Sequence, residues 1–261
     1  MRRLIPVLFC AALVGLTGGR PAGPAKARPM QAGADTARIH LGPAGAGSDA
    51  FVAWPAGRTA APAVIVLHEW WGLDAHIRDM ARRLAGQGYV AIVPDLYHGQ
   101  VAGDPARARA LKSALQDDDA FGLTDEAVRW LRGQPRTART RHAVLGFCMG
   151  GSLAQRYALR APGLAGVVMF YGTPETDPAR LASLAAPLQG HFGADDAGIP
   201  LRVVDSLRTG LAKAGKPVEI HLYPGAGHAF MHDGRESFRP DAARQAWART
   251  LAFLQQHLKE R

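Results

Sequence analysis

The stretch LGFCMGG, residues 145–151, places a cysteine where a predicted strand passes into a helix expected from Met149. A residue at the tip of so tight a turn has a strained backbone, and its neighbours two positions away must be small. Gly146 and Gly150 satisfy this condition. Cys148 would then lie at a helix N-terminus, where unpaired N–H groups favour a thiolate and help to hold an oxyanion. The stretch predicts a nucleophile, with a simply buried thiol as the alternative.

Strands and helices alternate on both sides of this turn. Residues 63–67 are a continuous apolar run, typical of a strand buried on both faces. Apolar residues recur at the helical period over residues 75–85, after the cap Asp74. Residues 38–41 and 50–54 favour a hairpin. Further strands are expected at 89–93, 143–145, 165–170, 188–192 and 218–222, and further helices within 105–133, from 149, at 200–214 and at 242–258. The alternation predicts a single α/β domain, with a mostly parallel sheet and helices on both faces.

The composition is that of a globular protein. The 261 residues are 48% hydrophobic and 20% charged, which excludes extensive disorder. The 30 glycines and 18 prolines have no triplet period and stay below the roughly 25–30% of low-complexity chains. A formal net charge of +9 suggests an anionic partner, but several of the cations lie in the first 27 residues and the others are interspersed with acids. We therefore expect no nucleic-acid partner.

The first 27 residues predict a signal peptide. Arg2 and Arg3 form a basic start, residues 4–17 are uncharged and mostly apolar, and residues 25–27, AKA, resemble a cleavage site. A spanning helix needs about 20 apolar residues, so we expect no stable membrane anchor. A buried first helix is the alternative, and the paired arginines leave a general or a twin-arginine export route open.

Export would also remove one of the two cysteines. Cys10 would leave with the signal peptide, so Cys148 would remain alone and no internal disulfide is expected. We expect cleavage near Ala27, a linker at residues 28–36 and one domain at residues 37–261. The mature protein would be periplasmic or secreted, and we expect it to be a monomer.

Polar residues follow two further predicted strands. Asp195 and Asp196 come after one, and His228 lies in a glycine-rich loop after the next. A cysteine nucleophile needs a base, and the base needs a carboxylate that fixes its tautomer. Taken singly, the aspartate could be a turn former and the histidine a surface residue. The order Cys148, Asp196, His228 is the nucleophile, acid, histidine order of hydrolases built on such sheets, and it predicts a catalytic triad.

Five segments form a specific combination. They are HEWWG at 68–72, PDLY at 94–97, the turn at 146–151, GADD at 193–196 with Pro200 four residues beyond, and GHAF at 227–230. Together they resemble the dienelactone hydrolase family (carboxymethylenebutenolidase-like) of the α/β-hydrolase fold, over roughly residues 64–258. The resemblance implies hydrolysis of an ester or lactone by a Cys-His-Asp triad without a metal or organic cofactor. It also implies that the acid is Asp196 and not its neighbour Asp195.

Glu69 follows the first buried strand. The simple interpretation is a locally hydrogen-bonded carboxylate, whereas the resemblance implies that Glu69 contacts Cys148 and takes part in its activation. A carboxylate beside the sulfur would keep the thiol neutral until substrate arrives, which also protects it from oxidation. The backbone N–H groups of Trp70 and Met149 are the expected oxyanion donors.

The chain departs from the family pattern on the substrate side. In dienelactone-cleaving members, arginines bind the substrate carboxylate, and one lies four residues after the catalytic histidine. Here that position is His232. Arg107 and Arg109 are candidates for the other cation, and Trp71 and Tyr97 for pocket walls beside Trp70. Each of these could instead be a solvated charge or a core aromatic residue.

Other functions compete with a small-ester or lactone hydrolase. An exported thioesterase or a general carboxylesterase would use the same residues on another acyl group. A non-catalytic binding module would lack a triad member, and a redox role for Cys148 would lack a resolving thiol. A metallohydrolase is disfavoured because His68-Glu69 has no second histidine four residues on, and the ten histidines show no ligand cluster.

Overall fold

The computed structural model describes residues 34–43, 47–57 and 60–259. The predicted signal peptide, Cys10 and most of the predicted linker lie outside the described residues. The first strand begins at Asp35, two residues before the predicted domain boundary. None of the described helices is long and apolar enough to cross a bilayer.

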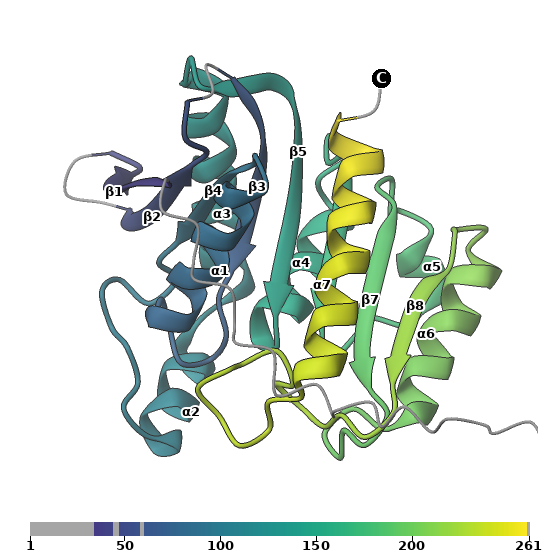
Figure 1. The fold of residues 1–261 in the computed structure, drawn as a ribbon. Helices are drawn as coiled ribbons and strands as arrows, with labels where there is room; N and C mark the ends of the chain where they lie inside the picture. Colours follow the sequence, from purple (N-terminus) through teal and green to yellow (C-terminus); the bar gives the residue numbers. More distant parts are fainter. Residues whose placement is uncertain (1–33, 44–46, 58–59, 260–261) are drawn as a thin grey trace, which may run out of the picture. The chain divides into compact units, whose positions relative to one another are not determined.

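The described residues form one eight-stranded sheet with the order β1-β2-β4-β3-β5-β6-β7-β8 (Figure 1). The pairs β1·β2 and β2·β4 are antiparallel and the other five pairs are parallel. The predicted α/β class with a mostly parallel sheet is confirmed. The strands are β1 (Asp35–Leu41), β2 (Ser48–Trp54), β3 (Ala61–Leu67), β4 (Val90–Pro94), β5 (Thr137–Phe147), β6 (Gly166–Phe170), β7 (Leu188–Gly193) and β8 (Glu219–Tyr223).

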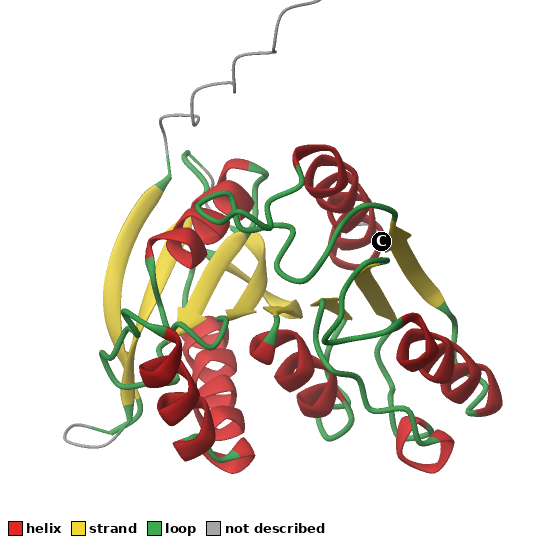
Figure 2. Ribbon diagram, turned by 90° about the horizontal axis from the view of Figure 1, so that it is seen from below, coloured by secondary structure: helices red, strands yellow, loops and turns green. Residues whose placement is uncertain are grey.

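Helices cover both faces of this sheet. Figure 2 shows α1 and α7 on one face and α3, α4 and α6 on the other. The helices are α1 (Ala75–Gly86), α2 (Pro105–Ala114), α3 (Asp117–Gly133), α4 (Met149–Ala158), α5 (Pro178–Leu181), α6 (Leu201–Lys213) and α7 (Pro240–Leu254), which continues into a π-helical turn at Gln255–Lys259. The short α5 is the one described helix that the sequence pattern does not predict.

Helix α1 follows directly from its sequence. The carboxylate of Asp74 accepts a hydrogen bond from the backbone N–H of Ile77 at 3.0 Å, which caps the first turn. Ile77, Met80 and Leu84 recur at the helical period and are almost fully buried against the sheet. Each such side chain stabilises the fold by about 1.5–3 kcal/mol. Because the cap fixes where α1 begins, it also fixes the loop that precedes it.

Two elements differ from the predicted ones. Strand β5 begins at Thr137, six residues before the predicted strand, and its polar first half pairs with β3 across a bulge. Polar residues give no apolar run there, so only the buried second half is visible in the sequence. In α7 the side facing the core consists largely of alanines, and Trp247 is half-buried, with the guanidinium of Arg83 4.4 Å from the centroid of its ring.

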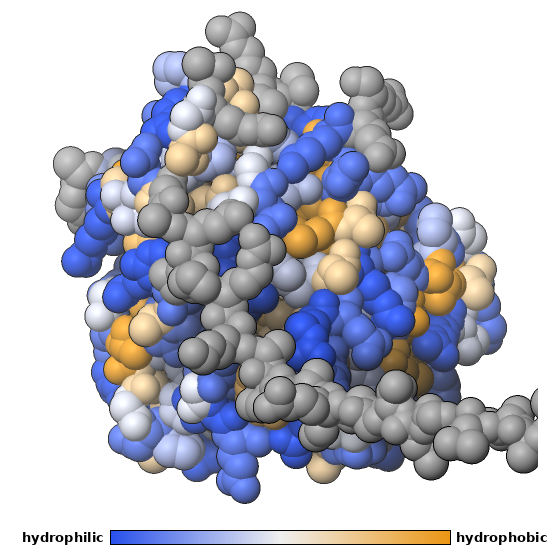
Figure 3. Space-filling model, in the orientation of Figure 1, coloured by the Kyte–Doolittle hydropathy of each residue, from blue (hydrophilic) through white to orange (hydrophobic). Residues whose placement is uncertain are grey.

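The apolar surface of the described residues is dispersed. The large apolar side chains that are exposed are Val101, Leu201 and Val218. In Figure 3 the face that carries α7 is mostly hydrophilic, with apolar residues in small separate groups.

The turn between β5 and α4 has a strained backbone. Cys148 caps α4 with φ 52° and ψ −115°, a conformation that L-residues rarely adopt and that costs about 1–3 kcal/mol. A Cβ atom on Gly146 would overlap the carbonyl oxygen of Gly150. A Cβ atom on Gly150 would overlap the carbonyl oxygen of Leu67 at the end of β3. Glycine is therefore required at both positions.

We predict opposite effects for two glycine substitutions in helices. Gly150→Ala should lower the free energy of unfolding by about 3 kcal/mol, because its Cβ overlaps backbone that β3 holds in place. Gly122→Ala should raise it by up to about 1 kcal/mol, since Gly122 is exposed in α3 and a Cβ atom there meets nothing within 4 Å. Urea unfolding measures both, and a Gly150→Ala variant as stable as the parent would contradict the packing described here.

Candidate active site

The side chains of Cys148, His228 and Asp196 meet at the carboxyl edge of the sheet. Nε2 of His228 lies 3.1 Å from Sγ of Cys148, and Nδ1 of His228 lies 2.8 Å from Oδ2 of Asp196. The three residues follow β5, β8 and β7, whose carboxyl ends lie at the lower edge in Figure 1. The structure thus brings together the three residues singled out in the sequence, within the hydrogen-bond reach that a nucleophile, a base and an orienting acid require.

Asp196 is held on both of its carboxylate oxygens. While Oδ2 faces His228, Oδ1 accepts hydrogen bonds from the backbone N–H groups of Gly198 at 2.8 Å and Ile199 at 3.1 Å. Burial raises the pKa of Asp196, but the hydrogen bonds outweigh burial and the net direction is downward. Asp196 is therefore ionised at neutral pH. Its neighbour Asp195 is exposed, and the carboxylate bonded to His228 is that of Asp196.

His228 lies between a carboxylate and a sulfur. Burial opposes its positive charge, but the hydrogen bonds with Asp196 and Cys148 outweigh burial and raise the pKa of His228 to about 10. The imidazole therefore carries a proton at neutral pH.

Glu69 is buried and faces Tyr171. The hydroxyl of Tyr171 donates to Oε1 of Glu69 at 3.3 Å, and among the described residues Glu69 makes no hydrogen bond with Cys148. In this arrangement the sulfur is paired with His228 instead, and the part that the family resemblance implies for Glu69 in activation stays a prediction. Burial raises the pKa of Glu69, and the nearby rings of His232 and His228 only partly oppose this.

Tyr171 is a site residue that the sequence analysis missed. Its ring packs edge-on against His228 with 5.2 Å between centroids, and its side chain is fully buried. Burial raises the pKa of Tyr171 well above its ordinary value, and negative charge on the neighbouring Glu69 and Cys148 acts in the same direction. The phenol therefore stays neutral and can donate a hydrogen bond. Its position directly after β6 was the available signal, since the chemistry of such sheets lies after strand ends.

The expected oxyanion donors, Trp70 and Met149, line the same cavity as Cys148. Met149 begins α4, so its N–H is one of the first-turn amides without an acceptor in its own helix. Trp70 lies in the turn after β3. Neither N–H has an acceptor among the described residues.

A cavity of about 470 Å³ opens above the sulfur. Cys148, Trp70 and Ile199 contribute to its walls, and two cations, Lys112 and Arg156, also line it. Arg156 is paired with Asp117 through two hydrogen bonds of 2.7 Å. Lys112 has no ion pair within the described ranges. Lys112, which is exposed, is therefore the unpaired one of these two cations that line the cavity.

The two predicted arginines do not line this cavity. Arg107 and Arg109 are exposed, and Arg107 bonds to the side chain of Gln100. Ala108 and Leu111 form the buried side of α2. Lys112 lies four residues after Ala108, so the helical period places it next to that side. Of these three cations of α2, Lys112 is the one among the residues that line the cavity.

The other predicted substrate contacts also lie outside the cavity. Tyr97 is buried and its hydroxyl contacts Sδ of Met149 at 3.2 Å, so it supports a cavity residue from behind. Trp71 packs under the guanidinium of Arg235, 3.9 Å from the ring centroid. His232 stacks on another histidine and is not among the residues that line the cavity. Of the predicted aromatic residues, Trp70 alone is among those that line the cavity.

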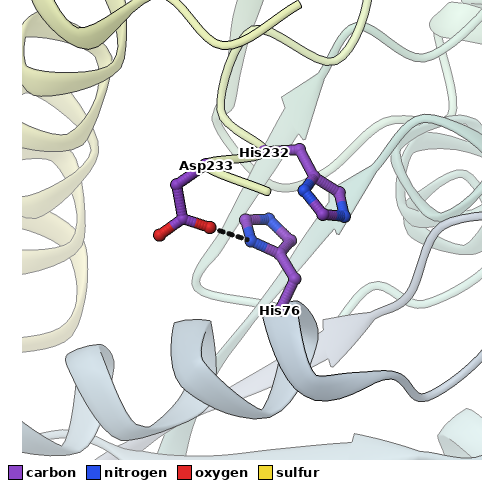
Figure 4. A group of neighbouring side chains, drawn as sticks. All are labelled: His76, His232 and Asp233. Atoms are coloured by element: carbon purple, nitrogen blue, oxygen red, sulfur yellow. Dashed lines mark hydrogen bonds and ion pairs between the residues drawn. The ribbon is translucent and has the colours of Figure 1, made fainter. Parts of the chain in front are cut away.

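A second group of side chains joins α1 to the loop that carries His228. Figure 4 shows His76, His232 and Asp233, with Nδ1 of His76 3.1 Å from Oδ1 of Asp233. The fold thus brings together two histidines and an aspartate that are far apart in the sequence. The two rings stack with 3.9 Å between centroids and 10° between planes. Lone pairs lie in the ring planes, so parallel rings do not aim them at one ion. The group instead packs the loop onto α1.

The chain is similar to known proteins of one hydrolase family. The model of the dienelactone hydrolase family matches residues 48–258. A protein of Methylorubrum extorquens named "Putative carboxymethylenebutenolidase" is 33% identical over 224 residues, which are 80% of this chain and 76% of that protein. A protein of Bradyrhizobium sp named "Probable 2-oxo-3-(5-oxofuran-2-ylidene)propanoate lactonase" is 32% identical over 233 residues, 84% of this chain and 94% of that protein.

A solved structure extends the likeness to three dimensions. It is described as "Putative Dienelactone Hydrolase" from Klebsiella pneumoniae, and it matches with a TM-score of 0.79 at 32% identity, covering 85% of this chain and 99% of that chain. The chain therefore belongs to the dienelactone hydrolase family, and it is a carboxymethylenebutenolidase-like hydrolase.

Proposed function

We propose that this hydrolase cleaves a small ester or lactone through Cys148, His228 and Asp196, with a thioester on Cys148 as the intermediate. One observation carries the proposal: a single imidazole lies 3.1 Å from the sulfur on one side and 2.8 Å from a buried carboxylate on the other. The base is thus already within proton-transfer distance of the nucleophile, and its tautomer is fixed.

Acylation uses the charge distribution of the site. The thiolate of Cys148, paired with protonated His228, attacks the carbonyl carbon, and the electron pair of the carbonyl moves to its oxygen. The N–H groups of Trp70 and Met149 hold that oxyanion. When the intermediate collapses, the carbon–oxygen bond breaks, His228 gives its proton to the leaving alkoxide or enolate, and a thioester remains.

Deacylation reverses these roles. Neutral His228 takes a proton from a water molecule, whose oxygen attacks the thioester carbonyl. The tetrahedral intermediate expels the sulfur as a thiolate, and the imidazolium forms again beside it. Asp196, ionised and held by two backbone amides, stabilises the imidazolium in both half-reactions.

The cavity supports a small substrate with an anionic group. Its volume of about 470 Å³ suits a small molecule, and Lys112 is the unpaired one of the two described cations that line it. Hydrolysis rates on p-nitrophenyl esters, thioesters and dienelactones would separate this substrate class from those of a thioesterase or a general carboxylesterase.

We expect Cys148→Ala to lower kcat for p-nitrophenyl acetate by several powers of ten, because no other nucleophile replaces the sulfur. Cys148 is partly exposed, so the free energy of unfolding of the variant should stay within about 1 kcal/mol of that of the parent. Arg109→Ala serves as the control and should keep the parental kcat, because Arg109 is exposed and is not among the residues that line the cavity. Hydrolysis by Cys148→Ala at the rate of the parent would refute the assignment.

Glu69 gives a prediction about stability and pH. Burial raises its pKa, so the folded protein holds this proton more tightly than the unfolded chain does. The stability contributed by protonated Glu69 is complete below pH 4.5, the ordinary pKa, and is lost as pH rises through the folded value. Glu69→Gln should therefore have a higher Tm than the parent at neutral pH, by about 2–4 °C for each kcal/mol that the substitution adds to the free energy of unfolding.

Thermal unfolding of both proteins across pH 4–8 measures this effect. The gain in Tm should disappear below pH 4.5. A Glu69→Gln variant that is less stable at neutral pH, or whose difference in Tm does not change with pH, would show that Glu69 is stabilised as a carboxylate in the folded protein.

A further inference from the structure

His68, at the end of β3, is buried without any exposed surface and has a hydrogen-bond partner on each ring nitrogen. Nδ1 lies 2.7 Å from the backbone oxygen of Glu69. The backbone N–H of Leu96, which follows β4, donates to Nε2 at 3.1 Å. The ring thus connects the loop after β3 with the loop after β4, and the mechanism described above does not use it.

These two contacts determine the tautomer of the ring. A backbone N–H can only donate, so Nε2 accepts and carries no proton in neutral imidazole. The proton is therefore on Nδ1, which donates to the oxygen of Glu69. Burial lowers the pKa of His68, more than the backbone oxygen of Glu69 and the nearby aspartates raise it, so the ring stays neutral. The ring of Tyr97 packs edge-on against it, with 5.0 Å between centroids.

The bond to Glu69 has a consequence one residue further along the chain. The carbonyl of Glu69 and the N–H of Trp70 belong to one planar trans peptide group and point in opposite directions. A donor that fixes the carbonyl therefore fixes the direction of the N–H. The same oxygen also accepts from the backbone N–H of Gly72 at 3.1 Å, so two donors hold this peptide from its carbonyl side.

We propose that His68 is a positioning residue for the oxyanion hole, which aims the N–H of Trp70 by holding the carbonyl of Glu69. This inference rests on the proposed function, in which that N–H stabilises the oxyanion. A donor stabilises a transition state most when its direction is fixed before the reaction, because no reorganisation is then needed. The N–H of Leu96 holds the ring of His68, and the ring in turn holds the carbonyl of Glu69. His68 itself touches no substrate.

Two substitutions separate the two hydrogen bonds. The amide of asparagine takes the place of Nδ1, so His68→Asn can still donate to Glu69 but loses Leu96. The amide of glutamine takes the place of Nε2, so His68→Gln can still accept from Leu96 but loses Glu69. If the role of His68 is purely structural, kcat should fall in each variant in proportion to its loss of stability. If His68 is a positioning residue, kcat should fall in the variant that loses the hydrogen bond to Glu69 and not in the variant that keeps it.

We expect His68→Gln to lower kcat for p-nitrophenyl acetate by about 10–100-fold with little change in KM, and His68→Asn to stay within about threefold of the parent. A trifluoromethyl ketone, whose tetrahedral adduct on Cys148 carries an oxyanion, should bind His68→Gln more weakly by a similar factor. Alkylation of Cys148 by iodoacetamide forms no oxyanion and should proceed at the parental rate in both variants.

The outcomes distinguish this inference from the proposed function. If the parent forms no ketone adduct on Cys148, the proposed function fails and the inference fails with it. If the parent forms the adduct but both variants keep, or both lose, kcat and ketone affinity to the same extent, the positioning role alone is wrong. Should His68→Gln fail to fold, His68→Asn decides by itself: activity near that of the parent at reduced Tm supports the role, and a loss of kcat beyond tenfold overturns it.

Discussion

The strained turn at Cys148 is the constraint on which the site depends. A positive φ at a residue with a side chain is unfavourable, and the sheet maintains it because Gly146 and Gly150 let α4 start against the backbone of β3. The bend moves the sulfur off the sheet edge and places it at the start of a helix. It also brings the Met149 N–H to one side of the sulfur, with Trp70 in the turn after β3. A larger residue at either glycine would push the helix away, and the geometry of the nucleophile and of the oxyanion donors would change together.

Opposite environments divide the charges of the site. Asp196 is buried but bonded to two backbone amides and His228, so it remains a carboxylate. Its charge and the neighbouring sulfur keep His228 protonated. Glu69 is buried, its side chain has one hydrogen bond among the described residues, from the hydroxyl of Tyr171, and its proton is held more tightly. The negative charge of Asp196 thus stabilises the imidazolium of His228, whereas Glu69 is a buried carboxyl group with a raised affinity for its proton.

Much of this arrangement could be predicted from local pattern, and the remainder depends on tertiary packing. Apolar runs and helical periods locate the buried strands and helices, and small residues around Cys148 mark the turn. The polar first half of β5 and the alanine-rich side of α7 carry no such pattern. The cavity cations were missed because Lys112 resembles any solvated lysine until the orientation of α2 is known. Tyr171 and the stacked pair of His76 and His232 likewise depend on which loops the sheet brings together.

The central claim is that the sulfur of Cys148 becomes covalently acylated during turnover. Peptide mass spectrometry of the protein, acid-quenched within milliseconds of mixing with p-nitrophenyl acetate, tests it most directly. The account predicts an added acetyl group on the peptide that contains Cys148, formed and lost at rates compatible with turnover. It also predicts that the adduct accumulates when His228 is replaced by asparagine and the protein is given time to acylate slowly. An unmodified Cys148 in a protein that is turning over ester, or an acetyl group on another side chain that forms and decays at the rate of turnover, would contradict it.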